Sequence, residues 1–321
     1  MRKGRFHNER PTEHAGFSDF LRWMGTRKPG LWRKWTDVPP VPPPRERIGF
    51  GEMRVTFVNH ATVLVQMDGV NILTDPIWSE RCSPVSFAGP KRVVPPGLRF
   101  EQLPPIDVVL VSHNHYHHLD VSTLRRLAAE HRPRILVPLG NRRVLDRAGV
   151  RGAEELDWWE AIDVRDGVRV AAVPAQHFSG RGMFDRDRAL WAGFVVSGPA
   201  GSAYFAGDTG FGPHFEEIRD RFGPPRLALL PIGAYRPEWF MSRVHMSPDE
   251  ALRAHRVLGA GTSVAIHFGT FRLADDGQEE APARVDALLR EGGAPRPRFW
   301  VLGFGEAREV PATAQTALVA G

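Results

Sequence analysis

The chain has 321 residues, of which 42% are hydrophobic, so it is long enough to bury a large core in one domain or two. No apolar run approaches the roughly 20 residues of a membrane span, and no apolar signal-peptide segment follows the basic N-terminus, so we expect an intracellular, cytoplasmic protein. Cys82 is the single cysteine, which excludes a disulfide within the chain and thiolate zinc sites. Any metal must therefore be bound by His, Asp or Glu.

The excess positive charge lies in the N-terminal segment. Residues 1–50 contain eleven Lys or Arg and five Asp or Glu, a net charge of +6 against +5 for the whole chain, so the remainder is close to neutral. Aromatic residues lie between these charges, at Phe6, Phe17, Phe20, Trp23, Trp32 and Trp35. This mixture suits a lipid headgroup boundary or nucleic-acid phosphates with stacked bases. An arm whose rings pack on the body while its cations stay in water is an equally good interpretation.

A proline-rich run at residues 39–44 predicts a stiff connector. We therefore expect a basic, aromatic arm and connector at 1–45 and a second domain at 46–321. In that domain, apolar runs bounded by turn residues predict a mixture of strands and helices. Strands are expected at 53–58, 61–66, 70–74, 106–111, 134–138, 168–174, 191–197, 203–206, 227–232 and 263–266. Helices are expected at 121–131, 141–148, 213–222 and 248–258.

Four histidines directly follow the predicted strand 106–111. They are His113, His115, His117 and His118. Imidazoles in a tight loop at a sheet edge can converge on one ion, so the spacing favours a metal site. A solvated histidine-rich loop is the alternative interpretation.

Three further strands each end near a residue of a metal-ligating type. These residues are His177, Asp208 and His267. Taken alone, His177 is better explained as a hydrogen-bonded structural histidine, and Asp208 as a turn residue in the sequence Gly-Asp-Thr-Gly. Because loops at one edge of a rigid sheet are where convergent sites are assembled, the three residues and the four histidines together predict a metal centre.

The histidine stretch resembles the His-x-His-x-Asp-His signature of the metallo-β-lactamase superfamily, and the order of His177, Asp208 and His267 matches the later ligands of that superfamily. More narrowly, several segments are similar to the N-acyl-phosphatidylethanolamine-hydrolysing phospholipase D family, over about residues 50–308. They include Asn59-His60-Ala61-Thr62, Leu73-Thr74-Asp75-Pro76-Ile77, Gly89-Pro90-Lys91-Arg92, Phe205-Ala206-Gly207-Asp208-Thr209-Gly210 and His267-Phe268-Gly269-Thr270-Phe271.

The resemblance implies an αββα sandwich, the metallo-β-lactamase fold, with two metal ions, normally Zn²⁺, at one edge. By position, the first metal would be held by His113, His115 and His177. The second would be held by His118 and His267, and Asp208 would bridge the two. Such a pair activates a hydroxide and clamps the attacking and leaving oxygens of a phosphodiester.

His245 also falls where the family has a histidine near the site. It could stabilise the phosphate or donate a proton to the leaving group. A histidine that merely flanks a helix is the alternative.

One position departs from the signature: His117 stands where the family has a metal-binding aspartate. Imidazole can coordinate through Nδ1 with a similar reach, but the site loses one negative charge. The substitution leaves three interpretations open, which are an altered binuclear site, a mononuclear enzyme and a poorly active variant. An imidazole-rich second site would also favour a different transition metal.

The resemblance implies a phospholipase D-type phosphodiesterase that acts on an N-acylated or other glycerophospholipid. On this hypothesis the basic, aromatic arm at 1–45 would be a peripheral membrane contact. One alternative is a metal-dependent hydrolase of a small phosphorylated or lactone metabolite. A nucleic-acid-binding nuclease is less expected, because the positive charge is confined to the arm. A purely structural metal is also disfavoured, since structural zinc sites are closed four-ligand sets and this chain offers more candidates.

Overall fold

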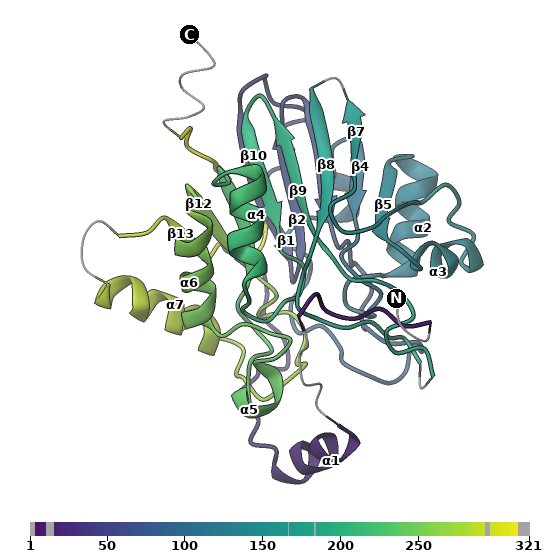
Figure 1. The fold of residues 1–321 in the computed structure, drawn as a ribbon, viewed down its shortest axis with the longest axis vertical. Helices are drawn as coiled ribbons and strands as arrows, with labels where there is room; N and C mark the ends of the chain where they lie inside the picture. The colour runs from purple at the N-terminus through teal and green to yellow at the C-terminus, as the bar shows by residue number, and fades with distance from the viewer. Residues whose placement is uncertain (1–3, 11–15, 166, 183, 293–295, 314–321) are drawn as a thin grey trace.

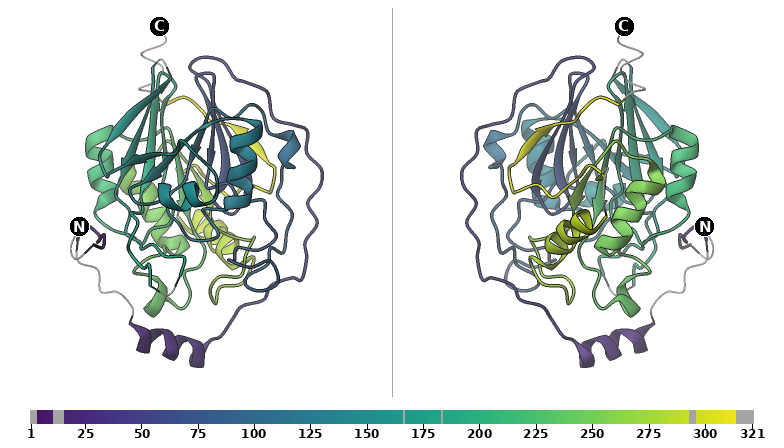
Figure 2. Two further views of the ribbon diagram at one scale, coloured as in Figure 1. Left: turned by 90° about the vertical axis from the view of Figure 1, so that its right-hand side faces the viewer. Right: turned by 90° about the vertical axis from the view of Figure 1, so that its left-hand side faces the viewer.

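The computed structural model describes residues 4–10, 16–165, 167–182, 184–292 and 296–313. The body consists of two facing mixed sheets with helices on both outer faces, as Figures 1 and 2 show. The predicted αββα sandwich is confirmed. Residues 1–3 and 11–15 of the predicted arm, and residues 314–321, lie outside the described residues.

The first sheet carries the loop with four histidines. Its strands are β1 (Met53–Asn59), β2 (Thr62–Met67), β3 (Val70–Thr74), β4 (Val108–Leu110), β5 (Arg134–Pro138), β6 (Glu154–Leu156) and β14 (Ala307–Glu309), in the order β14-β1-β2-β3-β4-β5-β6. The hairpins β1–β2 and β2–β3 are antiparallel, and β3 to β6 are parallel. Strands β1, β3 and β4 therefore end at the same edge of the sheet.

The second sheet delivers the remaining candidate ligands. Its strands are β7 (Ala161–Arg165), β8 (Val168–Val173), β9 (Gly193–Gly198), β10 (Gly201–Phe205), β11 (Leu227–Pro231), β12 (Thr262–Ile266) and β13 (Phe299–Trp300), in the order β13-β12-β11-β10-β9-β8-β7. Because β9 is antiparallel to both β8 and β10, and β10 to β12 are parallel, the strands β8, β10 and β12 end at one edge.

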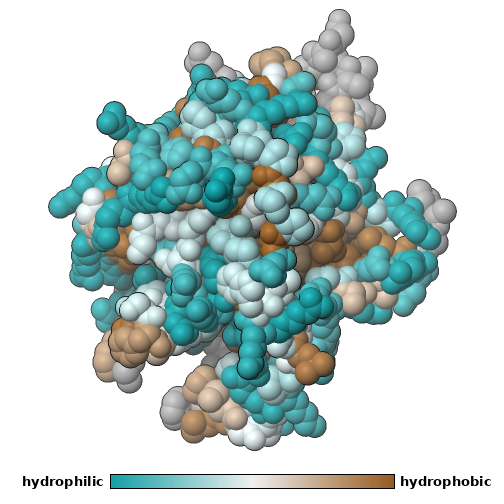
Figure 3. All heavy atoms as spheres, turned by 180° about the vertical axis from the view of Figure 1, so that it is seen from behind, coloured by the Kyte–Doolittle hydropathy of each residue, from teal (hydrophilic) through white to brown (hydrophobic). Residues whose placement is uncertain are grey.

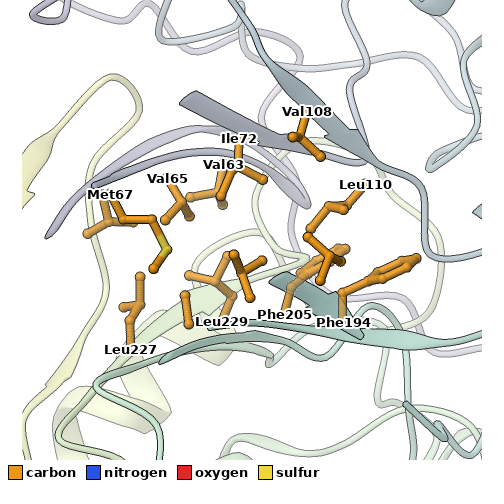
Figure 4. Close-up of a cluster of buried hydrophobic side chains, with 14 of the residues drawn as sticks. Val63, Val65, Met67, Ile72, Val108, Leu110, Phe194, Phe205, Leu227 and Leu229 are labelled. Carbon is orange, nitrogen blue, oxygen red and sulfur yellow. The ribbon is translucent and has the colours of Figure 1, made fainter. Parts of the chain in front are cut away.

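The core has three apolar layers because the central strands are buried on both faces. Between the sheets, Val63 and Val65 of β2 lie opposite Leu227 and Leu229 of β11 (Figure 4). The residue between the two valines, Leu64, points the other way and packs with the helices on the first sheet. This alternation is the two-residue period of a strand. It gives near-continuous apolar runs, which made these strands predictable.

Helices cover the two outer faces. Residues of α2 (Val121–Glu130) and α3 (Arg142–Arg147) pack on the first sheet, and those of α4 (His214–Phe222), α6 (Pro248–Leu258) and α7 (Glu280–Glu291) pack on the second. Every predicted strand and helix is present, with ends within two residues of those expected. The unpredicted elements are α1 (Phe17–Thr26), η1 (Phe100–Gln102), α5 (Glu238–Met241), α7, β6, β7, β13 and β14.

The N-terminal segment contains α1 and then runs along the outside of the molecule to β1 (Figure 2). Trp23 of α1 is buried in a small cluster with Ala234, Met241 and Ala274, and its indole nitrogen donates a hydrogen bond to Asp275 at 3.2 Å. Part of the segment thus packs on the body. Among the described residues, no helix has both the length and the apolar character needed to cross a membrane.

Candidate metal centre

The loops that follow β4, β8, β10 and β12 meet at one end of the sandwich. The structure brings together all seven predicted ligands and His245, in groups whose ligand atoms lie within 4.8 Å of one another. These groups are His113, His115 and His177; His60, His117, His118 and His267; Asp75, His113 and His118; and His177, Asp208 and His245. Two of the residues, His60 and Asp75, were not among the predicted ligands.

The first group has the donor arrangement of a three-histidine site. Nε2 of His113 lies 2.7 Å from Nδ1 of His115, which lies 3.3 Å from Nε2 of His177. Nδ1 of His177 donates a hydrogen bond to the carbonyl of Val244 at 2.9 Å, so the unprotonated Nε2 has a free lone pair. A single N–H on His115 can satisfy only one of its two neighbours at a time, whereas a cation satisfies all three nitrogens.

A buried carboxylate behind the histidine loop orients it. Asp75, which directly follows β3, accepts hydrogen bonds from the amide and hydroxyl of Ser112 at 2.7 and 2.6 Å and from Nδ1 of His118 at 2.5 Å. The Ser112 hydroxyl lies 2.9 Å from Nδ1 of His113. Asp75 thus fixes the outer nitrogens of His113 and His118, so that both rings present Nε2 to the centre, as outer carboxylates do for metal-binding histidines.

Asp208 lies between the two groups of histidines. Its Oδ2 is 3.0 Å from Nε2 of His118, 3.1 Å from Nε2 of His267 and 3.8 Å from Nε2 of His177. Its other oxygen, Oδ1, is buried and has no hydrogen-bond partner among the described residues. Burial alone would raise the pKa of Asp208, but the nearby His118 and His267 hold it well below its usual value. The carboxylate is therefore ionised and lies between the two groups of histidines, where it could contact a cation held by either group.

Most of the histidine rings are neutral at physiological pH. Burial lowers the pKa of His113, His117 and His177 well below the usual value and that of His115 to about 3. For His118, burial opposes protonation, but the carboxylates of Asp208 and Asp75 raise its pKa to about 10. Neutral rings offer the lone pairs that a metal needs, and binding would displace the Nε2 proton of His118. The residues thus fit a pair of transition-metal cations.

The histidines also line a cavity of about 790 Å³. His115, His117 and His245 lie on its wall together with apolar residues of the N-terminal helix and of the segment around α5. The apolar residues that line the cavity include Phe20, Trp23, Phe178, Phe240, Met241 and Leu273. Two cationic residues, Arg186 and Arg243, also line it. The centre is therefore accessible to a ligand with both apolar and anionic parts.

Sequence comparisons agree with this geometry. Residues 70–268 match the family model described as beta-lactamase superfamily domain. The chain belongs to the metallo-β-lactamase superfamily. N-acyl-phosphatidylethanolamine-hydrolyzing phospholipase D 1 of Caenorhabditis elegans is 43% identical over 230 residues, which cover 68% of this chain and 64% of that protein. The mitochondrial enzyme of the same name from Saccharomyces cerevisiae is 35% identical over 244 residues, which cover 74% of this chain and 52% of that protein.

Solved structures share the superfamily fold at low sequence identity. An isothiocyanate hydrolase from Delia radicum gut bacteria superposes with a TM-score of 0.62 at 20% identity, covering 80% of this chain and 98% of that one. The metallo hydrolase Igni18 of Ignicoccus hospitalis gives 0.59 at 21% identity, covering 82% and 100%. As a member of the superfamily, this protein is a metal-dependent hydrolase.

Within the superfamily signature, the structure places His117 next to a residue that sequence reasoning missed. Nδ1 of His117 lies 3.1 Å from Nε2 of His60, a buried residue in the turn between β1 and β2. The signal that could have found His60 and Asp75 is the one used for the other ligands, because each directly follows an apolar strand. Both strands end at the edge where β4 ends, so their turn residues reach the same centre.

Proposed function

We propose that this protein is a phosphodiesterase of the phospholipase D type, which hydrolyses an N-acylated or other glycerophospholipid. The observation that carries the proposal is the cavity of about 790 Å³, whose apolar wall leads directly to His115, His117 and His245. An acyl chain matches the apolar wall, and a phosphate beside the glycerol matches the cationic and metal-ligating end. The two similar phospholipases D support the same substrate class.

The predicted ligands divide between two ions, which we propose to be Zn²⁺. His113, His115 and His177 would hold the first, and His117, His118 and His267 the second, with Asp208 shared. Two such cations supply an activated water as nucleophile and neutralise charge on the phosphate. The chain's own part is to fix the donor atoms through Asp75 and to exclude bulk water with the apolar cavity wall.

His245 is the candidate for contact with the reacting phosphate. Its Nδ1 lies 3.9 Å from Oδ2 of Asp208, is buried and has no hydrogen-bond partner among the described residues. Burial lowers the pKa of His245 to about 4, so its ring is neutral near pH 7. A neutral ring can donate one N–H to a phosphate oxygen, and Arg186 and Arg243 on the same cavity wall would balance the phosphate charge.

A substrate panel tests the proposal. The purified protein is offered vesicles of N-acylphosphatidylethanolamine, vesicles of phosphatidylcholine, a soluble aryl phosphodiester and a lactone. We expect release of phosphatidic acid and an N-acylethanolamine from the first, with Asp208→Asn as the inactive control. Turnover of the lactone without turnover of any phosphodiester would contradict the proposal and favour a small-metabolite hydrolase.

We also propose that the protein is cytoplasmic and attaches reversibly to lipid through residues 1–45. On α1, beside the cavity, Phe20, Leu21 and Met24 are 42%, 53% and 50% exposed. Seen from behind, apolar side chains are interspersed with polar ones at the lower end of the molecule, where α1 lies (Figure 3). A single element of this kind gives weak, reversible membrane attachment.

Replacing both Leu21 and Met24 with serine is expected to lower activity on vesicles roughly 30-fold, because each apolar side chain lost from a lipid contact costs on the order of 1 kcal/mol. Activity on the soluble phosphodiester should stay unchanged. The matched control is Phe50→Ser, since Phe50 is 78% exposed but lies outside α1, shortly before β1. An equal loss on both substrates would show that α1 acts only through the structure of the enzyme.

A further inference from the structure

We propose that His60 is a ligand of the second metal, so that this metal is held by four imidazoles, from His60, His117, His118 and His267, together with Asp208. The inference rests on the proposed metal chemistry, and it adds a ligand that is not part of the superfamily signature. Ligand nitrogens of these four histidines lie within 4.8 Å of one another.

The backbone holds the His60 ring at the centre. His60 lies in the turn between β1 and β2 with a φ of +48°, and the residue is 1% exposed. Its amide donates to the hydroxyl of Thr270 at 3.0 Å, and its carbonyl accepts from the amide of His267 at 2.8 Å. The turn is thus tied to the loop that carries another ligand of the same metal, which fixes the ring centroids of His60 and His267 at 4.2 Å.

The atom that His60 presents is at ligand spacing from its neighbour. Nε2 of His60 lies 3.1 Å from Nδ1 of His117. Two neighbouring nitrogens bound to one zinc at about 2.0–2.1 Å stand about 2.9 to 3.4 Å apart, for five- or four-coordinate geometry. The other ring nitrogen, Nδ1 of His60, is buried without a hydrogen-bond partner among the described residues. Only an interaction at Nε2 can therefore offset the free-energy cost of burying this ring.

A hydrogen bond between the two rings is the competing explanation of the 3.1 Å spacing. It would occupy the Nδ1 lone pair of His117 or place a proton on that atom, and either outcome removes His117 from the metal. A cation uses both lone pairs at once. Since Asp208 also lies 3.0 Å from His118 and 3.1 Å from His267, the centre already has a carboxylate to balance its charge.

The replacement of the signature aspartate explains why a further ligand is useful. His117 supplies a donor atom without the negative charge of the aspartate, so the second metal loses Coulomb attraction. An additional neutral imidazole restores binding through another coordinate bond. Four imidazoles suit zinc, copper or nickel better than magnesium, calcium or manganese.

The test is the affinity and stoichiometry of Zn²⁺ binding to the full chain, measured by chelator competition and elemental analysis. His60→Gly is the main variant and His60→Asn the second, because glycine and asparagine accept a positive φ. We expect the unchanged protein to bind about two zinc ions and either variant to bind the second about 100-fold more weakly, with the first unaffected. The tightly bound first ion shows that the variant is folded.

The same substitutions in a His117→Asp background sharpen the result. In that background the carboxylate introduced at position 117 supplies a ligand atom and a negative charge, so loss of His60 should change the affinity for the second zinc ion less than about 5-fold. His131→Ala, directly after α2, controls for removal of a histidine away from the centre. Unchanged binding of the second ion in His60→Gly, or a single ion in the unchanged protein, would overturn the proposal. Two ions without phosphodiester turnover would instead reject the proposed function and leave the His60 assignment standing.

Discussion

Replacement of Asp208 by alanine is expected to reduce phosphodiester turnover on the order of 10³-fold or more. Asp208 is the one anion among the predicted metal ligands, and its Oδ2 lies within 3.1 Å of both His118 and His267. Without it, two cations would face mainly neutral imidazoles, and their mutual repulsion would expel one of them. A loss of about 4 kcal/mol of transition-state stabilisation corresponds to that factor in rate.

The measurement is kcat/KM on the phosphodiester that the substrate panel identifies, together with metal content per chain. We expect the zinc content to fall from about two to one or fewer as turnover is lost. Asp107→Asn is the matched control, because Asp107 precedes β4 at the end opposite the histidines and pairs with Arg47. Full turnover with two bound ions in the Asp208 variant would remove this residue from the mechanism.

The elements that position the site could be predicted because each is a long apolar run that ends at a chemically distinctive residue. Strand β8, for example, is buried at five of its six positions and leads to His177. Such a run is apolar on both faces because it is covered by a second sheet and by helices. Burial on both faces thus stabilises the strand and also produces the apolar run from which the strand could be predicted.

The elements that escaped prediction owe their structure to distant contacts. Strand β14 has only the sequence Ala-Arg-Glu and exists through its pairing with β1, some 250 residues earlier. Helix α7 buries only the small residues Ala281 and Val285 and carries a proline in its first turn, so its apolar face is faint. Helix α1 buries Trp23 while neighbouring apolar residues stay exposed, which reverses the usual pattern.

Within the site, residue type and strand position indicated which side chains could meet but not how they pair. The sequence placed seven candidate ligands at strand ends, and the structure brings them together; their assignment as ligands stays a prediction. His60 also directly follows an apolar strand, but it is not part of the signature from which the ligands are assigned, so it is not among the predicted ligands. Only the parallel course of β1, β3 and β4 places His60 and His117 at one edge.

Asp75 controls which nitrogen of His118 is available. The carboxylate is fully buried, and every hydrogen bond that it makes is one it accepts, from the amide and hydroxyl of Ser112 and from Nδ1 of His118. Because Asp75 holds a proton on Nδ1, the Nε2 of His118 is the nitrogen that faces Asp208, and a metal would bind there in place of the Nε2 proton. An amide at position 75 can keep the contact with the Ser112 backbone, but its NH₂ group would face the Ser112 hydroxyl and the N–H of His118.

Asp75→Asn is therefore expected to move the His118 proton from Nδ1 to Nε2, so that Nδ1 accepts from the new amide and Nε2 no longer binds metal. We expect the second zinc to bind about 10- to 100-fold more weakly, which is the usual effect of losing an outer hydrogen-bond partner of a metal-binding histidine. The first zinc should weaken less, because His113 meets Asp75 only through Ser112.

Zinc titration of the variant against a chelator measures both affinities, and the nitrogen-15 shifts of His118 report its tautomer independently of turnover. Asp68→Asn is the control, since Asp68 accepts backbone hydrogen bonds in the turn between β2 and β3, at the opposite edge of the first sheet. A second zinc bound as tightly as in the unchanged protein would contradict the role of Asp75. A loss confined to the second site would instead establish that the buried carboxylate acts by setting a tautomer, since general unfolding would release both ions together.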